Sequence, residues 1–140
     1  MLKLGLIVPS LNTVMEYELQ CMAAGSMSVH TSRISSTSQR NEPTDRERHL
    51  LWMETQVPAA ARLLADAKVD VICYGCTGGG ILQGPGRDRE ICAEITAHTG
   101  IPGTTTIASS VAALRALGAA RVSVASPYYP WLNAKLQAYL

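Results

Sequence analysis

Short apolar or alternating runs recur along this chain, separated by stretches patterned for helices, and each run stops at small or turn-forming residues. The runs lie at residues 2–9, 26–34, 69–75, 101–106 and 121–125. A nearly continuous apolar run is typical of a strand that is covered on both faces, as in a parallel sheet. Strands that alternate with helices favour an α/β fold, so we predict a doubly wound parallel sheet with flanking helices.

The segments between these runs carry helix signals. Residues 12–25 begin with Asn12, which can cap a helix, and finish at Gly25, which can end one. Polar residues 35–48 are expected to form a loop, and a long helix is expected from about residue 49 to residue 67.

Two later helices are expected near residues 88–100 and in the tail after residue 129. Proline in a helix interior removes a backbone donor, so Pro58 must bend or divide the long helix. The three glycines after Cys76 are expected to delay any helix at that point.

Composition narrows the class of protein. The chain has 140 residues, 47% of them hydrophobic, and a net charge of +1, with basic residues scattered along it. This pattern argues against nucleic acid or an anionic membrane as the main partner. The opening "MLKLGLIVPS" is too short an apolar run for a signal peptide, and no segment approaches a membrane span. We therefore expect a cytoplasmic protein whose four cysteines are reduced thiols.

The stretch "VDVICYGCTGGGILQGPGR", residues 69–87, ends a strand with two cysteines and three glycines. A redox pair needs its first cysteine exposed at the start of a helix, whereas Cys73 lies inside the strand and reads as a core residue. A zinc site would have to add Cys92 and His98, whose spacing is wide and which lack a second Cys-x2-Cys partner. These patterns predict no metal site.

Nucleotide-binding loops also fail on inspection. The Walker pattern ends in Gly-Lys-Ser/Thr, and no such tripeptide occurs in the chain. After Gly84 and Gly86, the dinucleotide fingerprint requires a third small residue where this chain has Arg89. The sequence therefore predicts no nucleotide cofactor.

What remains is Cys76 at the tip of a strand, followed by Thr77 and small residues. Backbone N–H groups exposed in such a turn can hold a carboxylate, and the same positive field would lower the pKa of the cysteine. Such a thiol could act as a nucleophile or a proton donor. Taken alone, the residues fit equally well a small hydrophobic side chain beside a glycine-rich connection.

Ligands of open parallel sheets bind beyond the carboxyl ends of the strands, where three predicted turns of this chain lie. These turns are Pro9-Ser10-Leu11-Asn12, Cys76-Thr77 and Ser126-Pro127-Tyr128. The last turn belongs to "RVSVASPYYPWLNAKLQAYL", which repeats the plan of "LKLGLIVPSLNTVMEYEL". An internal repeat and an ordinary further strand–helix unit both explain this similarity.

Three segments resemble the aspartate/glutamate racemase superfamily, in the branch with maleate cis–trans isomerase and arylmalonate decarboxylase. They are "GLIVPSLNTVMEYE", "VDVICYGCTGG" and "TTTIASSVAALRALGAARVSVASPYYPWLNAKL". The resemblance implies a fold of two pseudosymmetric lobes that face each other across a small dicarboxylate, each presenting one catalytic position. In this chain, residues 1–103 would form the first lobe and residues 104–140 the incomplete start of the second.

The resemblance also implies a site. Cys76 takes the first catalytic position, Asn12 and Tyr128 hold substrate carboxylates, and the amides of Gly75, Cys76 and Thr77 wrap the same anion. Pro9 and Ser10, in the first turn, complete the predicted substrate-binding set. The family's second catalytic cysteine falls beyond residue 140, so we expect the chain to be a fragment.

The function that the resemblance implies is a cofactor-independent isomerase or racemase of a small dicarboxylate. It also suggests a homo-oligomer. An arylmalonate-type decarboxylase is the first alternative, although decarboxylases carry another residue at the position of Cys76. A truncated lobe that binds anions without catalysis is the second alternative.

Overall fold

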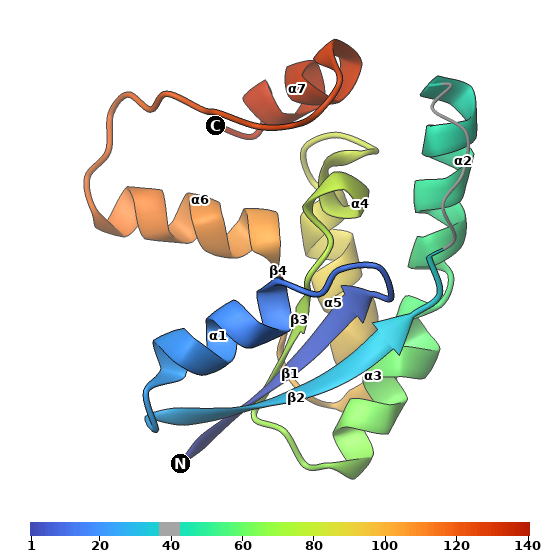
Figure 1. The fold of residues 1–140 in the computed structure, drawn as a ribbon, viewed down its shortest axis with the longest axis vertical. Coiled ribbons are helices and arrows are strands. Elements are labelled where there is room, and N and C mark those ends of the chain that lie inside the picture. The colour runs from blue at the N-terminus through green and yellow to red at the C-terminus, as the bar shows by residue number, and fades with distance from the viewer. Residues whose placement is uncertain (37–42) are drawn as a thin grey trace.

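The computed structural model describes residues 1–36 and 43–140, and it contains one four-stranded sheet (Figure 1). The strands are β1 (Leu2–Pro9), β2 (Met27–Ile34), β3 (Val71–Tyr74) and β4 (Gly103–Thr105), in the order β2-β1-β3-β4. Every neighbouring pair is parallel. The predicted parallel α/β sheet is confirmed.

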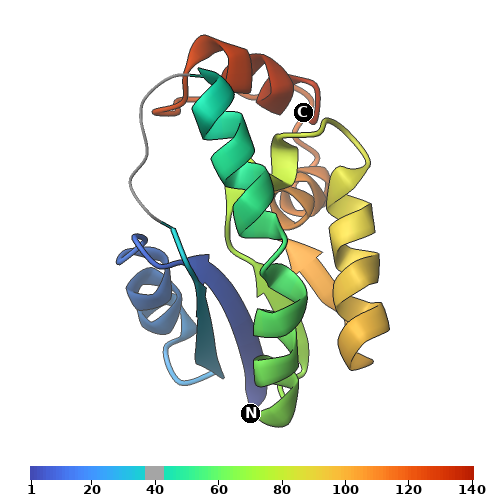
Figure 2. The same cartoon turned by 90° about the vertical axis from the view of Figure 1, so that its right-hand side faces the viewer.

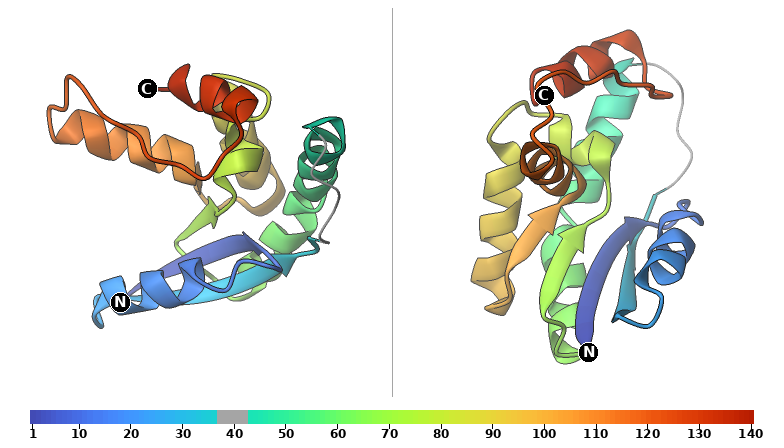
Figure 3. Two further views of the ribbon diagram at one scale, coloured as in Figure 1. Left: turned by 45° about the horizontal axis from the view of Figure 1, so that its top comes forward. Right: turned by 90° about the vertical axis from the view of Figure 1, so that its left-hand side faces the viewer.

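Seven helices surround this sheet in the described ranges: α1 (Met15–Ala23), α2 (Pro43–Glu54), α3 (Val57–Asp66), α4 (Thr77–Ile81), α5 (Arg87–Thr99), α6 (Thr106–Ala116) and α7 (Pro130–Gln137). The sheet lies between α1 on one face and the packed pair α3 and α5 on the other (Figures 2 and 3). Helices on both faces make the sheet doubly wound. None of these helices is long and apolar enough to cross a membrane.

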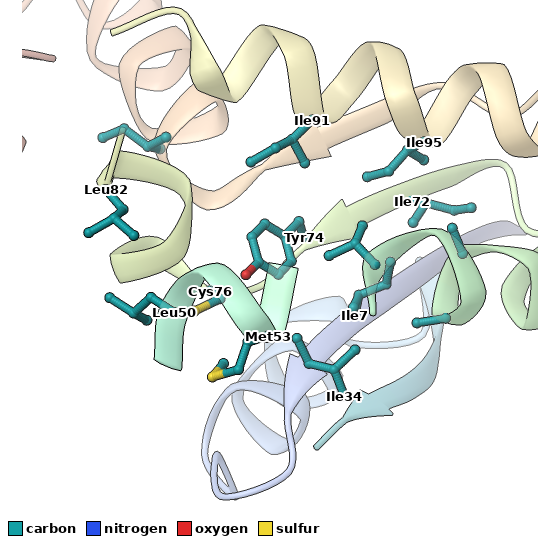
Figure 4. Packing of buried hydrophobic residues seen from close by; sticks show 14 of the residues in the cluster. Ile7, Ile34, Leu50, Met53, Ile72, Tyr74, Cys76, Leu82, Ile91 and Ile95 are labelled. Atoms are coloured by element: carbon teal, nitrogen blue, oxygen red, sulfur yellow. The ribbon is translucent and has the colours of Figure 1, made fainter. Parts of the chain in front are cut away.

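The core forms where β1 and β3 meet α3 and α5 (Figure 4). Ile7, Ile72 and Tyr74 are fully buried, and they face Ile91 and Ile95, which stand one helical turn apart on α5. Full burial of one such aliphatic side chain stabilises a fold by about 1.5–3 kcal/mol. Because the chain has no phenylalanine, aliphatic packing holds the strands in place.

The predicted long helix is divided, as Pro58 required. α2 ends at Glu54, and α3 begins at Val57 with the proline in its first turn, where no backbone donor is lost. The expected loop over residues 35–48 is wrong for its last part, because α2 already begins at Pro43. Residues 37–42 of that expected loop lie outside the described residues.

The three glycines do not delay a helix, contrary to expectation, since α4 starts directly after Cys76. Gly78, Gly79 and Gly80 are all buried in it. A methyl group on Gly79 would lie 2.5 Å from the Tyr74 hydroxyl oxygen, so position 79 has no room for a side chain. Packing against α2, α5, α6 and α7 therefore outweighs the low helix propensity of glycine.

The strand expected at residues 121–125 is also wrong. This segment runs without regular structure from α6 to α7 (Figure 1), and Val122 and Val124 are 41% and 53% exposed. A strand must pair its N–H and C=O groups with a neighbour, and no strand in the described part of the chain runs beside this segment. The predicted division after residue 103 falls within β4 and stays a prediction.

Gly103 offers a test of how closely α5 packs on β4. A methyl group there would lie 2.6 Å from the Cys92 carbonyl oxygen and 2.9 Å from Ile95 Cβ. We expect Gly103→Ala to lower the free energy of unfolding by about 1–3 kcal/mol, measured by denaturant titration. Gly80→Ala is the control, because its methyl would meet only Ile107 at 3.6 Å. Equal stability of the two variants would contradict this description of the packing.

Candidate functional site

The pairing of β1 with β3 brings two of the predicted turns together. Ile7 lies beside Tyr74 in the register, and the Gly75 N–H donates to the Ile7 carbonyl at 2.7 Å. A methyl group on Gly75 would lie 2.8 Å from Leu6 Cδ1 and 2.8 Å from Met15 Sδ. Gly75 therefore has no room for a side chain, which places the turn before Cys76 against the start of α1.

In the first turn, Asn12 has a fixed orientation. Its Oδ1 accepts from the N–H groups of Val14 and Met15, each at 3.0 Å, at the start of α1. The carboxamide oxygen is thus occupied, and the NH2 group is the part of Asn12 that can donate to a ligand. No hydrogen bond within the described ranges joins Asn12 to Cys76 or Tyr128.

The rest of the first turn is braced by β2 and the residues after it. Arg33 Nη1 donates to the Asn12 carbonyl at 2.9 Å, and its Nη2 pairs with Glu16 at 2.7 Å. Ser10 Oγ accepts from the Ser36 N–H at 2.9 Å. Ser10 therefore has a structural role in this structure, and its predicted contact with substrate stays a prediction, as does that of Pro9.

Cys76 occupies the residue before α4, in an extended backbone conformation. Its side chain is only 9% exposed, and it faces the core beside Leu50 and Met53 (Figure 4). Burial raises the pKa of the thiol, and the negative charge of Glu54 raises it further. The Gly79 N–H, the Tyr74 hydroxyl and Arg46 act in the opposite direction. The expected net lowering of the Cys76 pKa is therefore wrong, because burial outweighs the nearby amide.

Tyr128 reaches the same place from the segment before α7. Burial raises the pKa of its hydroxyl, the neighbouring Thr77 hydroxyl lowers it, and the proximity of Cys76 raises it. Thr77 Oγ1 in turn donates to Thr106 Oγ1 at 2.9 Å. The structure thus brings Thr77, Cys76 and Tyr128 together.

The turn that carries Tyr128 is held by its neighbours. The Tyr128 N–H donates to Ser126 Oγ at 3.2 Å, and Asn133 Nδ2 donates to the Tyr128 carbonyl at 3.0 Å. The first turn of α7 therefore fixes the backbone from which the phenol extends.

Sequence reasoning missed the buried polar groups behind Cys76. The Tyr74 hydroxyl is fully buried next to the sulfur, and Arg87 donates to Glu54 Oε1 at 3.0 Å and also pairs with Glu90 and Glu94. Arg87 is the first residue of α5, yet its side chain is only 16% exposed. Nothing in the spacing predicts this pairing, because Glu54 and Arg87 belong to different elements.

No group of three His, Cys, Asp or Glu side chains in residues 1–36 and 43–140 is arranged to hold a metal ion. The three cysteines of the zinc set considered above, Cys73, Cys76 and Cys92, are free thiols. His98 Nδ1 bonds the carbonyl oxygen of Glu94 on its own helix at 2.7 Å. The candidate site therefore consists of Cys76, the amide and hydroxyl groups beside it, and the turn after β1 that carries Asn12.

Comparison with known proteins gives consistent matches. The family described as arylmalonate decarboxylase matches residues 43–140. The maleate isomerase of Geobacillus stearothermophilus is 32% identical over 148 aligned positions, covering 99% of this chain and 58% of the relative. The crystal structure of the maleate isomerase Iso from Pseudomonas putida superposes with a TM-score of 0.87 at 27% identity, again covering 99% of this chain and 58% of that one.

A third match carries a trapped intermediate. It is a cysteine-to-serine variant of the Nocardia farcinica maleate cis–trans isomerase with a covalently bound succinylcysteine intermediate. The TM-score is 0.82 at 26% identity, with 99% of this chain and 58% of that chain covered. The chain thus spans a little over half the length of the relatives it matches.

Cys73, the other buried thiol of the strand, gives a test of burial at this end of the sheet. Burial raises its pKa from the ordinary 9.0 to about 11, and Cys92 adds to the rise. Between these two pH values the unfolded chain loses the thiol proton while the folded chain keeps it, so stability falls as pH rises through the window. We expect Cys73→Val to remove roughly 2–3 kcal/mol of that fall, measured by denaturant unfolding below pH 9 and near pH 11.

The control for this experiment is Cys21→Ser, which removes an exposed thiol and should leave the pH dependence of unfolding as it is. If the stability of Cys73→Val falls with rising pH as steeply as that of the unmodified chain, the Cys73 thiol is hydrated and the prediction is wrong.

Proposed function

Because the chain belongs to the arylmalonate decarboxylase family, we propose that it acts on a small dicarboxylate without a cofactor and that Cys76 is its reactive group. The observation that carries the proposal is the grouping of Cys76, Thr77 and Tyr128 at the carboxyl edge of the sheet. Of the chemistries within this family, we favour cis–trans isomerisation of maleate. The 32% identical relative is a maleate isomerase.

The proposed reaction begins with addition of the Cys76 sulfur, as a thiolate, to one alkene carbon. A C–S bond forms, and the π electron pair moves to the other carbon, where the adjacent carboxylate shares it. Rotation about the resulting C–C single bond follows. The electron pair then returns, the C=C bond forms again and the C–S bond breaks, which releases fumarate and restores the thiolate. A proton that enters the intermediate gives a succinyl-thioether and must leave again before elimination.

Two groups of donors would hold the carboxylates during this sequence. The Gly75 N–H belongs to the predicted set but already donates to the Ile7 carbonyl, so the amides of Cys76 and Thr77 supply the backbone N–H groups. The Asn12 NH2 group and the Tyr128 hydroxyl supply side-chain donors. Donors aimed at a carboxylate also stabilise the negative charge that the thiolate addition places on it. Pro9 and Ser10 would shape the edge of the same turn.

The thiol proton must leave before the attack, and burial opposes this step by raising the pKa of Cys76. By resemblance, we assign the second acid–base group to a cysteine of the second lobe, outside residues 1–140. We also propose that the protein works as a homo-oligomer in the cytoplasm.

A decarboxylase is the second candidate, because the matching family is described as arylmalonate decarboxylase. Racemisation is related to both reactions, since a thiol can remove a proton from the carbon beside a carboxylate and another thiol can return it. A lobe that only binds anions is the third candidate. All three would use the same donors, and they differ in what happens at the sulfur.

We expect maleate to label Cys76. After exposure to maleate and quenching, the peptide that contains Cys76 should gain the mass of one maleic acid molecule, and fumarate should appear in the proton NMR spectrum of the solution. Cys76→Ser should lose the adduct and lower the isomerisation rate by at least about a hundredfold, because serine is far less nucleophilic at neutral pH.

Cys73→Ala is the matched control, since it removes the other buried thiol of the same strand and should retain both the adduct and the turnover. Release of carbon dioxide from an arylmalonate without conversion of maleate would favour the decarboxylase. Full turnover of maleate by the Cys76→Ser variant would remove Cys76 from the mechanism.

A further inference from the structure

The Tyr74 side chain ends in a buried hydroxyl that has no hydrogen-bond partner among the described residues. Tyr74 is the last residue of β3, where it pairs with Ile7 on one side and Thr105 on the other, and none of its surface is exposed. A buried polar group costs stability unless a partner compensates for its lost hydration. Phenylalanine would fill the same space without this cost, so the hydroxyl needs an explanation.

The polar atom that this hydroxyl approaches is the Cys76 sulfur. A methyl group on Gly79 would lie 2.5 Å from Tyr74 Oη and 3.3 Å from Cys76 Sγ, so both atoms border the space that this glycine leaves empty. Figure 4 shows the hydroxyl directed toward Cys76 from the end of β3. Glycine at position 79 thus lets the hydroxyl and the sulfur face each other.

A charged side chain on a surrounding helix opposes ionisation of Cys76, so a neutral hydrogen-bond donor beside its sulfur would be useful. Glu54 on α2 opposes ionisation of Cys76, and its Oε2 is buried without a partner in the described residues. Its other oxygen accepts from Arg87 on α5 at 3.0 Å and from Gln83 at 3.3 Å.

Two other side chains act on the thiol or lie near it. Arg46, on α2, lowers the pKa of Cys76, and Tyr128 lies near the sulfur from the segment before α7. Arg46 is exposed to solvent, so its charge is screened. The neutral Tyr74 hydroxyl, which borders the same space as the sulfur, is a buried side-chain group that can stabilise negative charge on sulfur directly.

We propose that Tyr74 is a positioning residue for the reaction of Cys76: once the sulfur is ionised, the Tyr74 hydroxyl donates a hydrogen bond to it and holds the thiolate for attack on the substrate. This inference rests on the proposed function, because it assigns a role in the attack by Cys76. Burial and the neighbouring Cys76 raise the pKa of Tyr74, so the phenol keeps its proton and remains a donor while the sulfur ionises. A hydrogen bond to the charged form of a group favours that form, which here is the nucleophile.

The test compares Tyr74→Phe with the unmodified chain by alkylation of Cys76. The rate constant for iodoacetamide is measured between about pH 7 and pH 10 by mass spectrometry of the peptide that carries Cys76. We expect Tyr74→Phe to raise the apparent pKa by about one unit and to slow alkylation near neutral pH about tenfold. The melting temperature should stay the same or rise, because an uncompensated buried hydroxyl has been removed.

Three further variants make the result specific. Tyr17→Phe removes the hydroxyl of an exposed tyrosine and should leave the Cys76 profile unchanged. Gly79→Ala should slow alkylation as Tyr74→Phe does, because its methyl group occupies the space between oxygen and sulfur. Gly78→Ala controls for the added methyl, since its nearest contacts are Leu132 and Leu50 at 3.7 Å. These two glycine variants also decide the question if Tyr74→Phe does not fold.

An unchanged pH profile in Tyr74→Phe would overturn the proposal, as would a Cys76 that resists alkylation in the unmodified chain while Cys21 reacts. A role in packing alone would change the melting temperature but not the pH profile. The proposed function can fail separately: if the chain leaves maleate unconverted but Tyr74→Phe still slows alkylation, the assignment of Tyr74 stands and the maleate chemistry is wrong.

Discussion

Parallel pairing between β1 and β3 brings residues 9–12 and 75–77 to one edge of the sheet, although they lie in different parts of the chain. Both strands are buried on both faces, so neither can shift its register without exposing aliphatic side chains. The amides after β3, the carboxamide after β1 and the helix that follows Cys76 all depend on this register. α7 then adds Tyr128 by packing over α4. The chemistry of the chain therefore rests on a contact between two strands that carry no catalytic group themselves.

The surroundings of Cys76 combine two opposed effects. Burial excludes water and so disfavours a thiolate, while the same dryness strengthens every hydrogen bond that a thiolate can accept. A dicarboxylate bound at the edge of the sheet would enter a place where the dipoles that receive its charge are already fixed. Such an arrangement costs less reorganisation than one in which water must be displaced during the reaction.

The sequence was sufficient for the parallel sheet, the break near Pro58 and the position of Cys76 and Thr77 directly after β3. Each of these has a local cause: an apolar run, a missing backbone donor, or a residue placed directly after a strand. Prediction from the sequence failed where a feature depends on contacts between distant elements. The helix at Gly78–Gly80 forms because its neighbours pack against bare backbone, which no propensity scale contains. The segment 121–125 has the pattern of a strand, but a strand also needs a partner, and a pattern does not report one. The ion pair between Glu54 and Arg87 joins two helices whose contact cannot be read from either.

The three glycines of α4 differ in how freely they can change during evolution. Gly78 and Gly80 have ordinary van der Waals space for a methyl group, and Gly79 has none. Point mutations at the first and third positions would alter the stability of a short turn and could be compensated elsewhere. A mutation at the middle position presses directly on the oxygen and sulfur atoms at the reactive centre. Selection on catalysis would therefore act on a residue that has no side chain.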